Sequence, residues 1–77
     1  MIELALVEEK LKEAFPQGKI EVSDMTGTKD HIAIYIEDMA FQGKTLLEQH
    51  RMVQKALKEY LDSGEIHALK IKTSIPQ

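Results

Sequence analysis

The chain has 77 residues, of which 13 are acidic and 10 are basic; its formal net charge is -3, and it contains no cysteine. A chain of this length suits one small domain over residues 1–77, and it buries too little surface to enclose a deep active-site cavity. The acidic balance argues against a generally basic nucleic-acid binder, and no apolar run is long enough to span a bilayer. Since no export signal or disulfide framework is visible, we expect a cytoplasmic protein.

An amphipathic helix is predicted for residues 2–14. Its apolar residues recur at helical spacing and share one face: Leu4, Val7, Leu11 and Ala14. The helix should end in the stretch FPQG, because Pro16 and Gly18 both break helical structure.

Two strands are predicted next, in the stretches KIEVSD (19–24) and HIAIYIE (31–37). Ile32, Ile34 and Ile36 alternate with other residues, which is typical of a strand with one buried face. The intervening stretch DMTGTKD contains Gly27 and small polar residues, so it should form a turn or short loop. The two strands should therefore pair as an antiparallel hairpin.

One long helix should follow the connector DMAFQGK. Thr45 and Glu48 have the spacing of a capping box at its start, and Gly64 stands where a C-terminal cap is expected. Its apolar stripe is Leu46, His50, Val53, Leu57 and Tyr60 or Leu61. The closing strand places Leu69 and Ile71 on one face, with Lys70 and Lys72 on the other.

The resulting order, α-β-β-α-β, predicts an α+β fold with a three-stranded mixed sheet. A crossover through the long helix should place the third strand parallel to the second, with both helices covering one face. The other face should be mostly hydrated and should carry Glu21, Tyr35, Glu37, Lys70 and Lys72.

Two motifs at a fixed separation resemble the BolA family. They are FQGKTLLEQHRMVQKAL and, about ten residues later, IHALKIKTSIPQ. The matching positions are Phe41, Gly43, Thr45, His50, Arg51, Val53, Leu57, His67, Ala68, Leu69, Ile71, Thr73 and Pro76. The resemblance covers nearly the whole chain and implies a KH-like fold.

The resemblance also implies a non-enzymatic adaptor in iron–sulfur cluster assembly or trafficking. BolA-like proteins pair with monothiol glutaredoxins of the CGFS type, and the pair can hold a bridging [2Fe–2S] cluster with glutathione. The family's C-terminal histidine corresponds to His67, and a second ligand comes from a Cys or His near the first hairpin loop. Here DMTGTKD has neither, and the nearby candidate is His31, which matches the histidine often found at the head of the second strand in the family. No cofactor is expected in the isolated chain, which should be a monomer or weak homodimer.

The chemistry of imidazole supports a cluster role, because histidine can replace cysteine on one iron of a [2Fe–2S] centre. If the second and third strands are parallel, His31 and His67 head neighbouring strands about 5 Å apart. Strand alternation, however, places His67 on the helix side and His31 on the open side, so the rings should converge only if a strand end bends. The alternatives are a partly buried His67 at the core edge, a solvated His31, and a packed His50.

A nucleic-acid-binding transcriptional regulator, with a role in the stress response, is the alternative function. KH domains grip the nucleic-acid backbone through a G-x-x-G loop, but here FQGKTL lacks the second glycine. Lys44, Lys70 and Lys72 would provide weak, salt-sensitive contacts. We expect no enzymatic activity, because neither a nucleophile–base arrangement nor a phosphate-binding glycine loop is visible.

Overall fold

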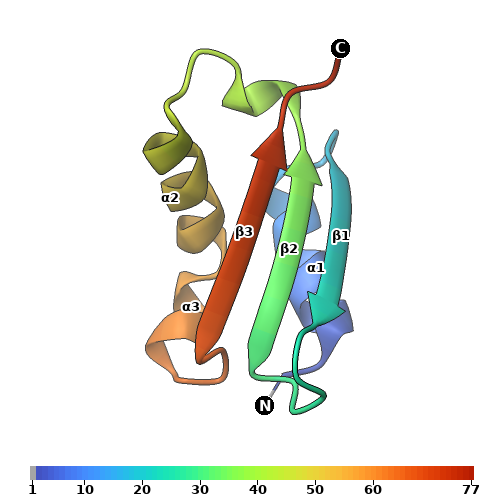
Figure 1. The fold of residues 1–77 in the computed structure, drawn as a ribbon, viewed down its shortest axis with the longest axis vertical. Coiled ribbons are helices and arrows are strands. Elements are labelled where there is room, and N and C mark those ends of the chain that lie inside the picture. The colour runs from blue at the N-terminus through green and yellow to red at the C-terminus, as the bar shows by residue number, and fades with distance from the viewer. Residues whose placement is uncertain (1) are drawn as a thin grey trace.

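The computed structural model describes residues 2–77 and has the predicted order of helices and strands (Figure 1). Its elements are α1 (Leu4–Ala14), β1 (Lys19–Asp24), β2 (His31–Glu37), η1 (Met39–Phe41), α2 (Leu46–Ala56), α3 (Lys58–Asp62) and β3 (Ala68–Ser74). The short 3-10 helix η1 lies in the predicted connector.

The sheet has the strand order β1-β2-β3 and is mixed, as predicted. β1 and β2 are antiparallel, with Lys19 opposite Glu37, whereas β2 and β3 are parallel, with His31 opposite Ala68. The N-terminal ends of β2 and β3 therefore meet at the same edge of the sheet (Figure 1).

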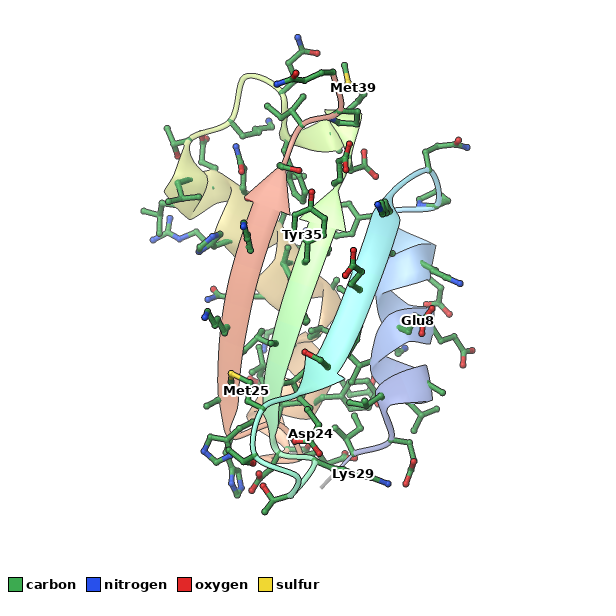
Figure 2. The ribbon with its side chains drawn as sticks, turned by 45° about the vertical axis from the view of Figure 1, so that its right-hand side comes forward. Glu8, Asp24, Met25, Lys29, Tyr35 and Met39 are labelled. Carbon is green, nitrogen blue, oxygen red and sulfur yellow. The ribbon has the colours of Figure 1, made fainter. Side chains whose placement is uncertain are left out.

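The core lies between the sheet and the helices, which cover one face. α1 packs against β1 and α2 packs against β3, while Ile32, Ile34 and Ile36 of β2 are buried beneath them. The opposite face is open, as predicted, and Figure 2 shows Tyr35 standing on it. The buried hydrophobic residues are Ile2, Val7, Leu11, Phe15, Ile32, Ile34, Ile36, Phe41, Val53, Leu57 and Ile66.

The prediction of one uninterrupted long helix is wrong at Leu57, where α2 gives way to α3. Leu57 has φ -108° and ψ 13°, and its carbonyl accepts a hydrogen bond from the N–H of Tyr60, three residues on. The local sequence has neither Gly nor Pro. We attribute the break to tertiary packing, since Leu57 is fully buried.

The start of α2 agrees with the predicted capping box but not with the predicted apolar stripe. The Thr45 hydroxyl accepts from the Glu48 N–H at 3.1 Å, and the Glu48 carboxylate accepts from the Thr45 N–H at 2.8 Å. Leu46, however, is 64% exposed, because burial along α2 begins only at the half-buried Gln49 and His50. Within residues 2–77, no helix is long and apolar enough to cross a membrane.

Candidate functional site: a histidine pair at the sheet edge

The edge where β2 and β3 begin brings two of the three histidines together. His31 is the first residue of β2, and His67 immediately precedes β3. Their ring centroids are 6.3 Å apart and the ring planes are nearly perpendicular, at 88°. Both side chains are accessible, with 41% of His31 and 60% of His67 exposed.

A single carboxylate, that of Asp30, joins the two rings. Its Oδ1 lies 2.8 Å from Nδ1 of His31, and its Oδ2 lies 3.1 Å from Nδ1 of His67. The backbone carbonyl of Asp30 accepts hydrogen bonds from the N–H groups of His67 at 2.8 Å and Ala68 at 3.2 Å. Asp30 therefore contacts both rings and also fastens the start of β3 to the start of β2.

Asp30 is ionised over the whole physiological pH range. A hydrogen bond from the Thr28 hydroxyl, then the hydrogen bond with His31, lower the pKa of Asp30 to about 2. An opposite charge on either imidazole acts in the same direction when that ring is protonated. The site thus combines two titratable rings with a permanent negative charge.

The hairpin loop before Asp30 is ordered by its own side chains. Asp24 accepts hydrogen bonds from the backbone N–H groups of Thr26, Gly27 and Lys29 at 3.2, 3.0 and 2.9 Å. Lys29 has φ 57°, and its carbonyl accepts from the N–H of Ile2 at 2.9 Å. Figure 2 shows Asp24, the last residue of β1, and Lys29 of this loop at the same end of the sheet. The loop was predicted as a turn, and these bonds place Asp30 at its end.

The two rings converge because the chain bends before β3, which is the condition that strand alternation set. β3 begins at Ala68, and His67 lies in the preceding bend. A residue outside the ladder does not follow the two-residue period of strand side chains. The residue that closes the core here is Ile66, which is 2% exposed, so the partly buried alternative for His67 is wrong.

Asp30 was not predicted as a site residue. The only available sequence clue is its position directly before a histidine that heads a strand, next to a parallel strand headed by a second histidine. The relevance of that clue depends on the register of β2 and β3, which the sequence alone does not give.

The part of the chain that the structure describes provides too few ligands to complete a metal site from this pair. Among residues 2–77, no group of three or more His, Cys, Asp or Glu side chains is arranged to hold a metal ion. His50 lies apart on α2 and is half-buried, in agreement with a packed position. Any metal centre at His31 and His67 therefore requires ligands from another molecule.

The predicted basic residues lie elsewhere. Lys70 and Lys72 line a hollow of about 290 Å³ on the open sheet face, together with Tyr35 and the acidic Glu21. Tyr35 is held there by a 2.7 Å hydrogen bond between its hydroxyl and that of Ser74. Lys44 is exposed in the loop before α2 and does not line this hollow.

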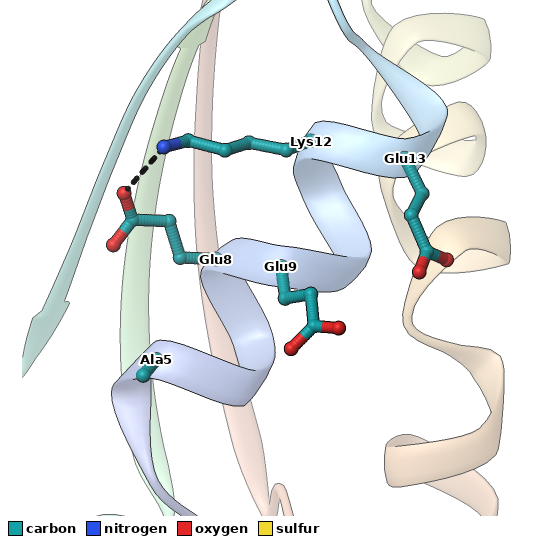
Figure 3. Close-up of a pocket in the computed structure, with 5 residues that line it drawn as sticks. All are labelled: Ala5, Glu8, Glu9, Lys12 and Glu13. Atoms are coloured by element: carbon teal, nitrogen blue, oxygen red, sulfur yellow. Dashed lines mark ion pairs between the residues drawn. The ribbon is translucent and has the colours of Figure 1, made fainter.

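A larger hollow of about 600 Å³ lies on the outer surface of α1 and is formed by that helix alone (Figure 3). Its lining residues are Ala5, Glu8, Glu9, Lys12 and Glu13. Lys12 pairs with Glu8 at 3.3 Å, one helical turn away. The carboxylates here form a hydrated helix face, with no second element to enclose a ligand.

Comparison with known proteins identifies the family. The model of BolA-like proteins matches residues 3–77. The chain belongs to the BolA family. A protein of Rickettsia prowazekii is 42% identical over 71 residues, which cover 91% of each chain. Human BolA-like protein 3 is 42% identical over 69 residues, which make up 87% of this chain but 63% of the human protein.

Solved BolA structures have the same fold. The BolA domain of SufE1 from Arabidopsis thaliana matches with a TM-score of 0.86 and 32% identity, covering 95% of this chain and 91% of that domain. BolA1 from the same plant gives a TM-score of 0.86 and 30% identity, over 97% and 95% of the two chains. The resemblance and the α+β fold predicted from the sequence are thus confirmed.

Proposed function

We propose that this BolA-family protein is a non-enzymatic adaptor in iron–sulfur cluster assembly or trafficking. It would share a [2Fe–2S] cluster with a monothiol glutaredoxin of the CGFS type and with glutathione. His67 would be its main ligand and His31 the second. BolA-family proteins are generally regulators or adaptors rather than enzymes, which agrees with this role.

The proposal is supported mainly by two accessible histidines that both contact the carboxylate of Asp30. The rings of His31 and His67 lie 6.3 Å apart at an open edge of the sheet, where a second protein can approach both. We assign the main role to His67 because 60% of its side chain is exposed, compared with 41% for His31.

The chemistry of the chain favours a shared cluster over a resident one. With no cysteine, the chain supplies no thiolate, which iron–sulfur clusters require. Imidazole can take positions that thiolates otherwise occupy on one iron, and the substitution raises the reduction potential. The missing thiolates would come from the glutaredoxin cysteine and glutathione.

Co-expression with a CGFS glutaredoxin tests the proposal. We expect a heterodimer on size exclusion whose visible absorbance and circular dichroism differ from those of the glutaredoxin holding a cluster by itself. His67→Ala should abolish the mixed spectrum, and His31→Ala should weaken it.

His50→Ala is the matched control, since it removes an imidazole from the half-buried face of α2. It should lower stability and leave the cluster spectrum unchanged. An unchanged spectrum in His67→Ala, with the heterodimer intact, would mean that His67 is not a ligand.

A second candidate function, nucleic-acid binding, is favoured by one observation. Lys70, Lys72 and Tyr35 lie around the same hollow on the open sheet face, where a base could stack and a phosphate could be neutralised. The net charge of -3 and the incomplete G-x-x-G loop oppose strong binding. We expect weak binding that decreases as the salt concentration rises. This binding should be lost in the double variant Lys70→Ala/Lys72→Ala and, separately, in Lys44→Ala. Sub-micromolar, sequence-selective binding at physiological salt would promote this candidate over the adaptor.

A further inference from the structure

Asp30 contacts the two proposed ligands through different oxygens of one carboxylate, at 2.8 Å for His31 and 3.1 Å for His67. We propose that Asp30 is a positioning residue: its hydrogen bond holds His31 in the tautomer protonated at Nδ1, and its charge beside Nδ1 of His67 favours a proton on the same nitrogen of that ring, so that both Nε2 atoms keep a lone pair for metal. This inference rests on the proposed function and names the residue that prepares the site.

The hydrogen-bonding capacity of the two groups decides which imidazole nitrogen carries the proton. An ionised carboxylate only accepts hydrogen bonds, so a neutral imidazole bonded to it through Nδ1 must donate from that nitrogen. The remaining nitrogen, Nε2, then carries the lone pair. Metal-ligating histidines commonly use such a carboxylate partner, which fixes the tautomer and the orientation of the ring and raises the basicity of the ligand.

The backbone of Asp30 adds to the positioning. Because its carbonyl accepts from the N–H groups of His67 and Ala68, the bend that carries His67 is tied to the loop that carries the carboxylate. The carboxylate is held in turn by the Thr28 hydroxyl, which donates to the Oδ1 atom that faces His31. Asp30 is therefore fixed relative to both rings before any partner arrives.

Asp30→Asn is the sharpest test, because a carboxamide replaces one accepting oxygen by a donating NH₂ group. The variant side chain can accept an Nδ1–H from one ring only. The NH₂ group favours a lone pair at Nδ1 of the ring that it faces, so that Nε2 of that ring carries the proton. One of the two histidines should thus change tautomer, while the shape of the side chain is nearly unchanged.

The first measurement uses the isolated full chain and needs no cluster. Imidazole ¹⁵N shifts recorded at about pH 8, above the ordinary histidine pKa of about 6.5, report which nitrogen is protonated. We expect Nδ1–H at both His31 and His67 in the wild type and a change in one of them in Asp30→Asn. Asp62→Asn removes an exposed carboxylate on α3 and should change neither ring. Protonation at Nε2 in both wild-type rings would overturn the proposal, even if the variant failed to fold.

The second measurement uses the heterodimer with the glutaredoxin. Asp30→Asn should shorten by about 10–100-fold the time for which the heterodimer keeps its cluster in the presence of a chelator, in line with the usual loss of metal affinity when such a partner is removed. The control Asp62→Asn should not change this time. Asp30→Glu, which keeps a carboxylate, should recover part of the loss. If His67→Ala removes the cluster but Asp30→Asn does not shorten its retention, the positioning role is wrong and the adaptor function stands. If His67→Ala has no effect, the adaptor function fails, and the tautomer result still decides what Asp30 does to the rings.

Discussion

Asp30 and Asp38 flank the central strand, one directly before β2 and one directly after it, and their carboxylates contact different kinds of group. Asp38 is 7% exposed, and its carboxylate accepts from the backbone N–H of Ala40 at 2.8 Å at the start of η1. Its own N–H donates to the carbonyl of Ser74, at the end of β3. Asp30 fastens the other end of β3 through its carbonyl, but its carboxylate faces two accessible imidazoles.

The difference shows how to separate a structural aspartate from a functional one. A carboxylate whose partners are backbone N–H groups, as at Asp38, stabilises the fold. A carboxylate whose partners are exposed imidazoles, as at Asp30, lies outside the core, and we propose that it controls the tautomer of those rings. Substitutions at the Asp38 end should therefore change stability, and substitutions at the Asp30 end should change the site.

The largest expected effect is the loss of stability in Phe41→Ala, near Asp38. Phe41 is fully buried, and its ring packs against Phe15 at a centroid distance of 5.3 Å. Removing a buried aromatic ring typically costs about 3–5 kcal/mol. Urea denaturation should show this loss, whereas Leu47→Ala, which removes a side chain from a residue 60% exposed, should change little. Similar stability of the two variants would contradict the assigned core.

Asp38→Ala should have the next largest effect. It removes the cap of η1 and leaves the N–H of Ala40 without that acceptor, and such losses cost about 0.5–2 kcal/mol. Denaturant titration measures the change, and the mixed cluster spectrum of the heterodimer should survive. A variant that kept full stability but lost the spectrum would reverse the roles assigned to the two aspartates.

Asp30 should contribute to stability in a narrow acid range. Its pKa is lowered to about 2 in the folded protein, from an ordinary value of 3.8. The folded state therefore favours the ionised form, so the contribution is complete above about pH 4 and is lost as the pH falls towards 2. Between these limits, stability should fall less steeply in Asp30→Asn than in the wild type. The free energy of unfolding of both proteins would be measured by denaturant titration at pH 4, 3 and 2. Equal slopes of that free energy against pH would show that Asp30 has an ordinary pKa.

The smallest effect is expected for Thr28→Val. The Thr28 hydroxyl is the largest cause of the lowered pKa of Asp30, so its removal should raise that pKa towards 3.8. The contacts from Asp30 to His31 and His67 do not involve Thr28, and the cluster spectrum should be retained. Titration of the Asp30 carboxyl carbon by NMR measures the shift. An unchanged pKa would mean that the His31 and His67 imidazoles, and not Thr28, lower the pKa of Asp30.

The fold was predictable because its main determinants are local. Alternation at Ile32, Ile34 and Ile36 identified β2 and its buried face, and the spacing of Thr45 and Glu48 located the start of α2. The break at Leu57 was not predictable, because it depends on packing between elements rather than on Gly or Pro. The exposure of Leu46 was missed for a similar reason, since helical spacing does not tell where a helix meets the sheet.

The site was predictable only in part. The sequence indicated that His31 and His67 head adjacent strands and that their rings converge only if a strand end bends, but not that the bend falls at His67, one residue before β3. Asp30 was missed because its partners come from two segments that are distant along the chain, and only the register of β2 and β3 brings them together. The ligand roles of His31 and His67 remain predictions.

The most direct test of the central claim is whether nitrogen from His67 is bound to the cluster. The chain would be labelled with ¹⁵N-histidine, combined with an unlabelled CGFS glutaredoxin and glutathione, and reduced for pulsed electron paramagnetic resonance. We predict a ¹⁵N hyperfine coupling typical of an imidazole bound to iron, present in His50→Ala and lost or strongly reduced in His67→Ala. A reduced cluster in the heterodimer without ¹⁵N coupling, or a coupling unchanged in His67→Ala, would contradict the account.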